Sequence, residues 1–161
     1  MIHAADLREL VIRPALKYVD LWSQSAENLL VGTWFQESSI AGSTRLKQVK
    51  GPALGGYQIE PATHKDNWIH FLRYPRQNDL RDRVMSLIPP NGFNPDGTVK
   101  DSELIWNLPY ATVIARIKYL RVPDAIPASD DLLGLAAYWN EHYNANPIHG
   151  HDEDWIRNYP K

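Results

Sequence analysis

The sequence predicts an all-α domain with room for one small β-ribbon. Apolar residues recur at helical spacing over most of the chain, and clusters of proline and glycine divide it into helix-length segments. Only residues 38–59 have the Ser, Gly and Thr content of loop or short β-structure. A chain of 161 residues with 43% hydrophobic content can bury one core but is too short for two ordinary domains. We therefore expect a single domain over residues 1–161.

The expected helices follow from apolar spacing and from start and stop signals. Residues 4–21 indicate one helix kinked at Pro14 or two short helices. Ser25 can cap a helix that runs to Gln36, and Pro61 suits a first helical position. Asn91 to Thr98 has the composition of a surface turn. Further helices are expected at residues 61–73, 78–88, 102–107, 109–120, 130–143 and 152–158, and a β-ribbon between Val49 and Ile59.

The bulk composition excludes several classes of partner. The net charge of −2 gives no basic surface for nucleic acid and no lysine-rich membrane face. Without cysteine, neither disulfides nor thiolate metal sites can form. No apolar run approaches the roughly 18 residues of a membrane span, and Met1 to Leu10 is too charged for a signal peptide. We expect a protein that is made in soluble form, with no nucleic-acid or membrane partner.

Glu37 is the candidate catalytic acid. It follows Leu30 and Trp34 at helical spacing, which places its carboxylate on the line of an apolar face. Desolvation there would raise its pKa, and a carboxylic acid still protonated near neutral pH can protonate a departing sugar oxygen. The alternative is that Glu37 simply ends a helix and points to solvent.

Three motifs carry a family resemblance. They are Glu37-Ser38, the phrase from Gly51 to Pro61 that contains Gly56-Tyr57-Gln58-Ile59, and Tyr143-Asn144-Ala145-Asn146-Pro147. In this order they resemble the soluble lytic transglycosylase and goose-type lysozyme superfamily. Tyr57 stands where the family has Leu or Phe, and Asn146 where it has Gly. A rival match to the third motif is Ala136-Ala137-Tyr138, with Asn140 beyond an intruding Trp139. The phrase continued through Ala62-Thr63-His64 looks like a small set of bacteriophage proteins.

The resemblance implies a protein with a lysozyme-like fold that cleaves the MurNAc-GlcNAc β-1,4 bond of peptidoglycan without a metal or other cofactor. Glu37 would act as acid and then base, and Tyr143 would hydrogen-bond to it and orient it. Substrate binding would involve Ser38, Tyr57, Gln58, His64 and Asn144. For His64, packing or helix capping is an equal alternative to a substrate contact.

The identity of a second carboxylate decides the expected products. Glu60 shares a face with Gln58 if the strand is extended, but Pro61 also gives Glu60 a structural role before a helix. With only Glu37 secured by the motifs, the resemblance implies a transglycosylase route to 1,6-anhydromuramyl products. His149 and His151 with Asp152 and Asp154 have metal-compatible side chains, but a solvated tail loop is the favoured interpretation.

The phage-like phrase favours a virion-associated or lysis enzyme. It would reside in the phage virion or the host cytoplasm before release to the cell wall, with the peptidoglycan glycan strand as its partner and other virion proteins as further partners. The alternative is a non-catalytic virion or glycan-binding protein that retains the fold, because fold does not fix function.

Overall fold

The structure, a computed structural model, describes residues 2–40, 43–144 and 151–161. It is mainly helical, which confirms the expected all-α class. The elements in chain order are α1 (Ala4–Asp6), η1 (Leu7–Ile12), α2 (Arg13–Tyr18), α3 (Gln24–Ser38), β1 (Ser39–Ile40), β2 (Ser43–Thr44), α4 (Pro61–Asn67), η2 (Trp68–Leu72), η3 (Pro75–Gln77), α5 (Asn78–Ser86), η4 (Pro90–Gly92), α6 (Glu103–Trp106), α7 (Leu108–Leu120), α8 (Leu132–His142) and α9 (His151–Asn158). None of the helices in these residues is long and apolar enough to cross a membrane.

The N-terminal segment is one helical run rather than two helices. α1, η1 and α2 follow one another directly, and η1 is a π-helix that ends just before Arg13-Pro14. Proline lacks an amide hydrogen and crowds the preceding turn, so a wider turn lets the run continue past it.

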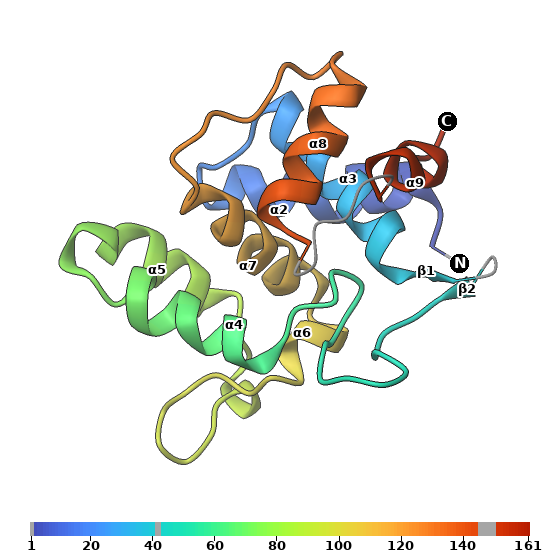
Figure 1. Ribbon diagram of the computed structural model, residues 1–161. Coiled ribbons are helices and arrows are strands. Elements are labelled where there is room, and N and C mark those ends of the chain that lie inside the picture. Colours follow the sequence, from blue (N-terminus) through green and yellow to red (C-terminus); the bar gives the residue numbers. More distant parts are fainter. Residues whose placement is uncertain (1, 41–42, 145–150) are drawn as a thin grey trace.

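α3 lies at the centre of the molecule and packs against η1, α7, α8 and α9 (Figure 1). Its cap is Ser23, whose Oγ accepts a hydrogen bond from the amide of Ala26 at 3.0 Å, and not the expected Ser25. Several adjacent polar residues lie at the start of the helix, and this hydrogen bond identifies the first of them as the cap. The helix extends to Ser38, two residues beyond the expected end.

α9 is seated on α3 through a large ring. The indole of Trp155 is fully buried and occupies the space beside Gly32, where an added Cβ would lie 1.8 Å from Trp155 Cζ2. Asn158 Nδ2 donates to Gln36 Oε1 at 2.8 Å. The two contacts fix α9 along the helix that carries Glu37.

The β-structure differs from the expectation. β1 and β2 pair antiparallel with Ser39 opposite Thr44, directly after α3, whereas the expected ribbon between Val49 and Ile59 is wrong. That segment contains only isolated bridges of Leu54 with Lys47 and with Ile59. Gln58 has a positive φ of 47° and closes a turn back to Gly55, whose φ is 73°. Gln58 is therefore not on an extended strand, and strand alternation does not relate it to Glu60.

The remaining helices match their predicted positions, with shifts of one or two residues at their ends. α4 begins at Pro61 as expected and continues through the π-helical η2. Asn107 caps α7 and Asp131 caps α8 through side-chain hydrogen bonds. In Figure 1, α4 and α5 lie on one side of α7, and α8 and α9 lie on the other.

A buried ion cluster joins the N-terminal run to α3. Glu27 is fully buried and accepts hydrogen bonds from Arg8, Arg13 and Trp22 at 2.7 to 2.9 Å. Burial alone would raise the pKa of Glu27, but these three donors outweigh it and hold the pKa at about 2. Glu27 is therefore a buried structural anion that joins the N-terminal run to α3.

Candidate active site

Glu37 lies in the last turn of α3 at the edge of a small pocket of about 110 Å³. The pocket is formed where the ends of α3 and α8 meet α7 and the turn before α4. Its lining residues are Glu37, Gln58, Ile59, Glu60, Thr63, Lys118 and Tyr143.

The carboxyl group of Glu37 has the environment of an acid that can lose and regain a proton near neutral pH. Burial raises its pKa to about 7, although a hydrogen bond from Trp139 and the charge of Lys118 act in the opposite direction. Trp139 Nε1 donates to Glu37 Oε1 at 3.0 Å. The alternative that Glu37 simply ends its helix and points to solvent does not fit this environment.

Lys118 is a pocket residue that the sequence analysis missed. Its Nζ donates to the backbone oxygen of Tyr143 at 2.6 Å and lies 3.7 Å from the centre of the Tyr143 ring. Burial lowers the pKa of Lys118 to about 8, although the charges of Glu37 and Glu60 favour its protonated form. The available signal was a charged residue between two apolar ones, Ile117 and Tyr119, in a helix whose residues are mostly buried.

The hydroxyl of Tyr143 has a different partner from the one expected. It donates to the backbone oxygen of Tyr57 at 2.8 Å and not to Glu37. The prediction that Tyr143 bonds directly to the Glu37 carboxylate is therefore wrong. The donor that takes this place is Trp139, the residue that interrupts the rival motif. Tyr143 still lines the pocket, and it holds the backbone of the turn that presents Gln58.

The rival tyrosine lies elsewhere. Tyr138 donates its hydroxyl to the backbone oxygen of Asp124 at 2.9 Å, and its ring stacks on Tyr119. The geometry favours Tyr143 as the motif tyrosine. The rest of that motif, Ala145-Asn146-Pro147, lies outside the described residues.

Gln58 and Glu60 reach the pocket from the turn that precedes α4. The side chain of Gln58 donates to the backbone oxygen of Gly55 at 2.7 Å, which fixes its direction. Glu60 is exposed, occupies the N-cap position of α4, and lines the same pocket as Glu37. A second carboxylate is therefore present at this pocket, although not by the strand geometry that suggested it.

Two of the expected substrate contacts are buried in the core instead. Tyr57 is 0% exposed, its ring meets Trp34 edge-on at 5.1 Å, and its hydroxyl pairs with Thr112. Ser38 is also 0% exposed and donates back to the oxygen of Trp34 at 2.6 Å. The absence of a side chain at Gly56 lets the neighbouring Tyr57 side chain point into the core. The Gly56 backbone lies so close to the Trp34 ring that a Cβ would overlap it. Tyr57 and Ser38 are therefore packing residues.

His64 is a packing residue too. It is 2% exposed, and its ring nitrogens are 2.7 Å from Asp101 Oδ1 and 2.5 Å from the Tyr110 hydroxyl. Burial lowers the pKa of His64 although Asp101 opposes the shift, so the ring is neutral at neutral pH. Of the two interpretations left open by the sequence, the structure shows packing.

Asn144 connects helices and does not line the Glu37 pocket. Its Nδ2 lies 3.1 Å from Asn140 Oδ1 and 2.8 Å from His151 Nδ1. Within the described part of the chain, no three His, Asp or Glu side chains are placed to hold a metal ion. His151 begins α9, whereas His149 lies outside the described residues.

Comparisons with protein-family models, with curated proteins and with solved structures found no significant match to this chain.

Proposed function

We propose that this chain is a peptidoglycan-cleaving glycosidase with a lysozyme-like fold, and that it acts as a lytic transglycosylase. The observation that carries the proposal is the carboxyl group of Glu37, whose pKa is raised to about 7 and which lines a pocket of about 110 Å³. A group with this pKa is a competent acid in its protonated form and a competent base after it has given up its proton.

The reaction uses Glu37 twice. In the first step the carboxylic acid protonates the glycosidic oxygen while the bond to the anomeric carbon of the muramic residue breaks. In the second step the Glu37 carboxylate accepts the proton of the muramic 6-hydroxyl while that oxygen attacks the anomeric carbon. The product is a 1,6-anhydro ring, and Glu37 is again protonated, so no water is consumed.

The hydrogen bond from Trp139 and the charge of Lys118 suit this double role. Both favour the charged form of Glu37, and so they limit a pKa that burial alone would raise further. The resulting value near 7 leaves both protonation states accessible at neutral pH. Gln58 and Thr63 supply polar groups at the pocket wall for sugar hydroxyls.

Hydrolysis is the second candidate, and the position of Glu60 favours it. Glu60 lines the pocket with Glu37, and glycoside hydrolases use a pair of carboxylates to activate water or form a covalent intermediate. The two candidates differ in product, because hydrolysis leaves a reducing end where transglycosylation leaves an anhydro ring.

The test is digestion of purified sacculi followed by mass spectrometry of the soluble products. We expect muropeptides lighter than the reducing forms by one water, and their loss in Glu37→Gln but not in the exposed Glu153→Gln. Reducing ends alone would overturn the transglycosylase route, and loss of activity in Glu60→Gln would then identify the second carboxylate. If the parent protein released no soluble product, the proposed enzymatic activity would be wrong. The non-catalytic virion or glycan-binding protein would then remain as the interpretation.

The proposed setting is a virion-associated or lysis enzyme of a bacteriophage. This part rests on the resemblance of the Gly51–His64 phrase to phage proteins. It predicts that the protein meets peptidoglycan as a component of a particle or at host lysis.

A further inference from the structure

A second and larger cavity lies on the opposite face of α4 from Glu37. Its volume is about 570 Å³, within the range typical of small-ligand sites. Ala62, Lys65 and Ile69 line it from positions i, i+3 and i+7, which share one helix face. Thr63, which lines the Glu37 pocket, lies on the other face. α4 therefore separates the two cavities.

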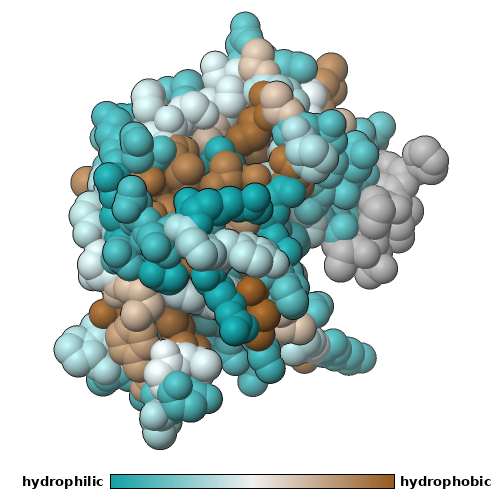
Figure 2. Space-filling view, turned by 90° about the vertical axis from the view of Figure 1, so that its left-hand side faces the viewer, coloured by the Kyte–Doolittle hydropathy of each residue, from teal (hydrophilic) through white to brown (hydrophobic). Residues whose placement is uncertain are grey.

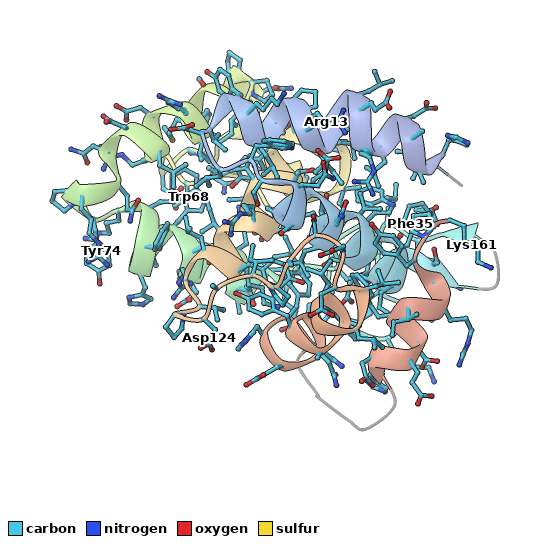
Figure 3. The ribbon with its side chains drawn as sticks, turned by 90° about the horizontal axis from the view of Figure 1, so that it is seen from above. Arg13, Phe35, Trp68, Tyr74, Asp124 and Lys161 are labelled. Atoms are coloured by element: carbon cyan, nitrogen blue, oxygen red, sulfur yellow. The ribbon has the colours of Figure 1, made fainter. Side chains whose placement is uncertain are left out.

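The cavity has two walls. Residues 61–73 with Met85 form one, and residues 94–101 form the other. The apolar lining consists of Trp68, Ile69, Met85 and Val99, together with Pro61 and Ala62. Trp68 Nε1 already donates to the Tyr110 hydroxyl at 2.8 Å, so the indole offers the cavity apolar surface rather than a donor. In Figure 3, Trp68 and Tyr74 lie toward one end of the molecule, away from Phe35 and Lys161.

The charged side chains of this cavity are divided between its two walls, with the cations on one wall and the carboxylates on the other. Lys65 and Arg73 belong to the helical wall, and Asp96 and Asp101 belong to the loop wall. Within the part of the chain that the structure describes, neither Lys65 nor Arg73 forms an ion pair or a side-chain hydrogen bond. Figure 2 shows the side of the molecule where α5 lies, with hydrophobic patches between hydrophilic side chains. The cavity therefore offers two unpaired cations at an apolar floor.

The opposite wall holds two carboxylates in place. Asp96 accepts hydrogen bonds from the amide and the hydroxyl of Thr98, which lower its pKa and keep it charged at neutral pH. Asp101 Oδ1 is 2.7 Å from the neutral ring of His64. A neutral sugar chain would gain nothing specific from two walls of opposite charge. A ligand that carries both signs would pair with both.

We propose that this cavity binds a short peptide that carries carboxylates and an ammonium group, namely the stem peptide of peptidoglycan. Its carboxylates would pair with Lys65 and Arg73, its ammonium with Asp96 and Asp101, and its aliphatic parts would cover Trp68 and Ile69. The identity of the peptide rests on the proposed function.

The two cavities lie on different faces of α4, so a stem peptide in the larger cavity would leave the Glu37 pocket free for a glycan strand. The larger cavity would then distinguish cross-linked from uncross-linked glycan strands through their peptides and not through their sugars.

The test measures binding without catalysis. The Glu37→Gln chain would be titrated with free stem tetrapeptide, L-Ala-γ-D-Glu-meso-diaminopimelate-D-Ala, and separately with chitotetraose, a peptide-free sugar. Calorimetry gives the affinity, and amide chemical shifts report where each probe binds. We expect the tetrapeptide to shift the amides of residues 94–101, and the double variant Lys65→Gln/Arg73→Gln to weaken its binding at least about tenfold.

Controls keep the result specific to the cavity. Lys161→Gln removes a remote exposed cation and is expected to bind like the parent, whereas Met85→Trp fills the cavity from an exposed position and is expected to block the peptide. An unchanged affinity in the double variant, or chitotetraose and not the peptide in this cavity, would overturn the proposal. If the chain bound the peptide but cleaved no sacculi, the proposed enzymatic activity would be wrong and the proposed peptide site would be retained.

Discussion

The indole N–H of Trp139 donates to Glu37 Oε1 at 3.0 Å, across 102 residues of sequence. This bond fixes the orientation of the carboxyl group and favours its charged form. Tyr143, the residue expected in that role, supports the neighbouring backbone instead.

Trp139→Phe should raise the pKa of Glu37 above about 7, because the phenyl ring cannot donate to the carboxylate. Activity that needs protonated Glu37 falls as pH rises through this pKa, so the alkaline limb of the pH profile should move to higher pH. The profile of kcat/KM on solubilised glycan strands checks this. Trp106→Phe, at a ring 65% exposed, is the matched control and should leave the limb in place.

Lys118→Met should also raise the pKa of Glu37, because it removes the cation whose charge favours the carboxylate. Lys118→Arg keeps the charge and should restore most of the parent value. A carbon-detected NMR titration of the Glu37 carboxyl measures the pKa without any substrate. The same pKa in the Met variant and the parent would show that Lys118 only anchors the Tyr143 backbone.

Glu37→Gln should change how stability depends on pH. The folded-state pKa of about 7 lies above the ordinary 4.5, so the fold favours protonated Glu37. Its contribution is fully present below pH 4.5 and is lost as pH rises through about 7, a change of about 3 kcal/mol. The Tm of the Gln variant, relative to the parent, should therefore rise from pH 4.5 to pH 8. A difference that stays constant over this range would contradict a raised pKa.

Tyr143→Phe should lower turnover by about tenfold, the usual effect of losing one hydrogen bond that positions a site. The lost bond to the Tyr57 backbone oxygen frees the turn that presents Gln58. Tyr138→Phe removes a bond to Asp124 outside the pocket and should have little effect on turnover. If the two effects were reversed, Tyr138 would be the functional tyrosine despite its position.

Glu27→Gln should destabilise the fold by about 3 kcal/mol at neutral pH, because it removes a buried anion from Arg8 and Arg13. The pKa of Glu27 is lowered to about 2, so its contribution is present above 4.5 and is lost as pH falls toward 2. Urea unfolding at pH 7 and pH 3 measures the change, with the exposed Glu153→Gln as control. Equal destabilisation at both values would indicate lost packing rather than lost charge.

The sequence predicted the features that depend on near neighbours. Helical periodicity located the helices, and the spacing from Leu30 to Glu37 placed the carboxylate on an apolar line. Pro61 marked a helix start because its fixed φ is a local effect. The cap of α3 was misplaced because adjacent polar residues offer the same local chemistry.

The missed site residues depend on tertiary contacts. Trp139 of α8 bonds to Glu37 and Lys118 of α7 acts on it through its charge, and no local pattern in the sequence records either relationship. Tyr57 was assigned to the groove from its place in a motif, but a motif does not say which way a side chain points. The close approach of Gly56 to Trp34 turns Tyr57 inward, and that approach is visible only in the folded chain.

The seat of Trp155 against Gly32 has a consequence for how the protein is made. A chain leaves the ribosome from its N-terminus, so the helix that carries Glu37 emerges long before α9. Until Trp155 follows, the notch at Gly32 has no ring to fill it, and Asn158 cannot bond to Gln36. In the nascent chain, α3 therefore lacks these two contacts until α9 has been made and has docked. An unfinished translation product would carry every residue of the Glu37 pocket and still lack the packing that holds α3 in place.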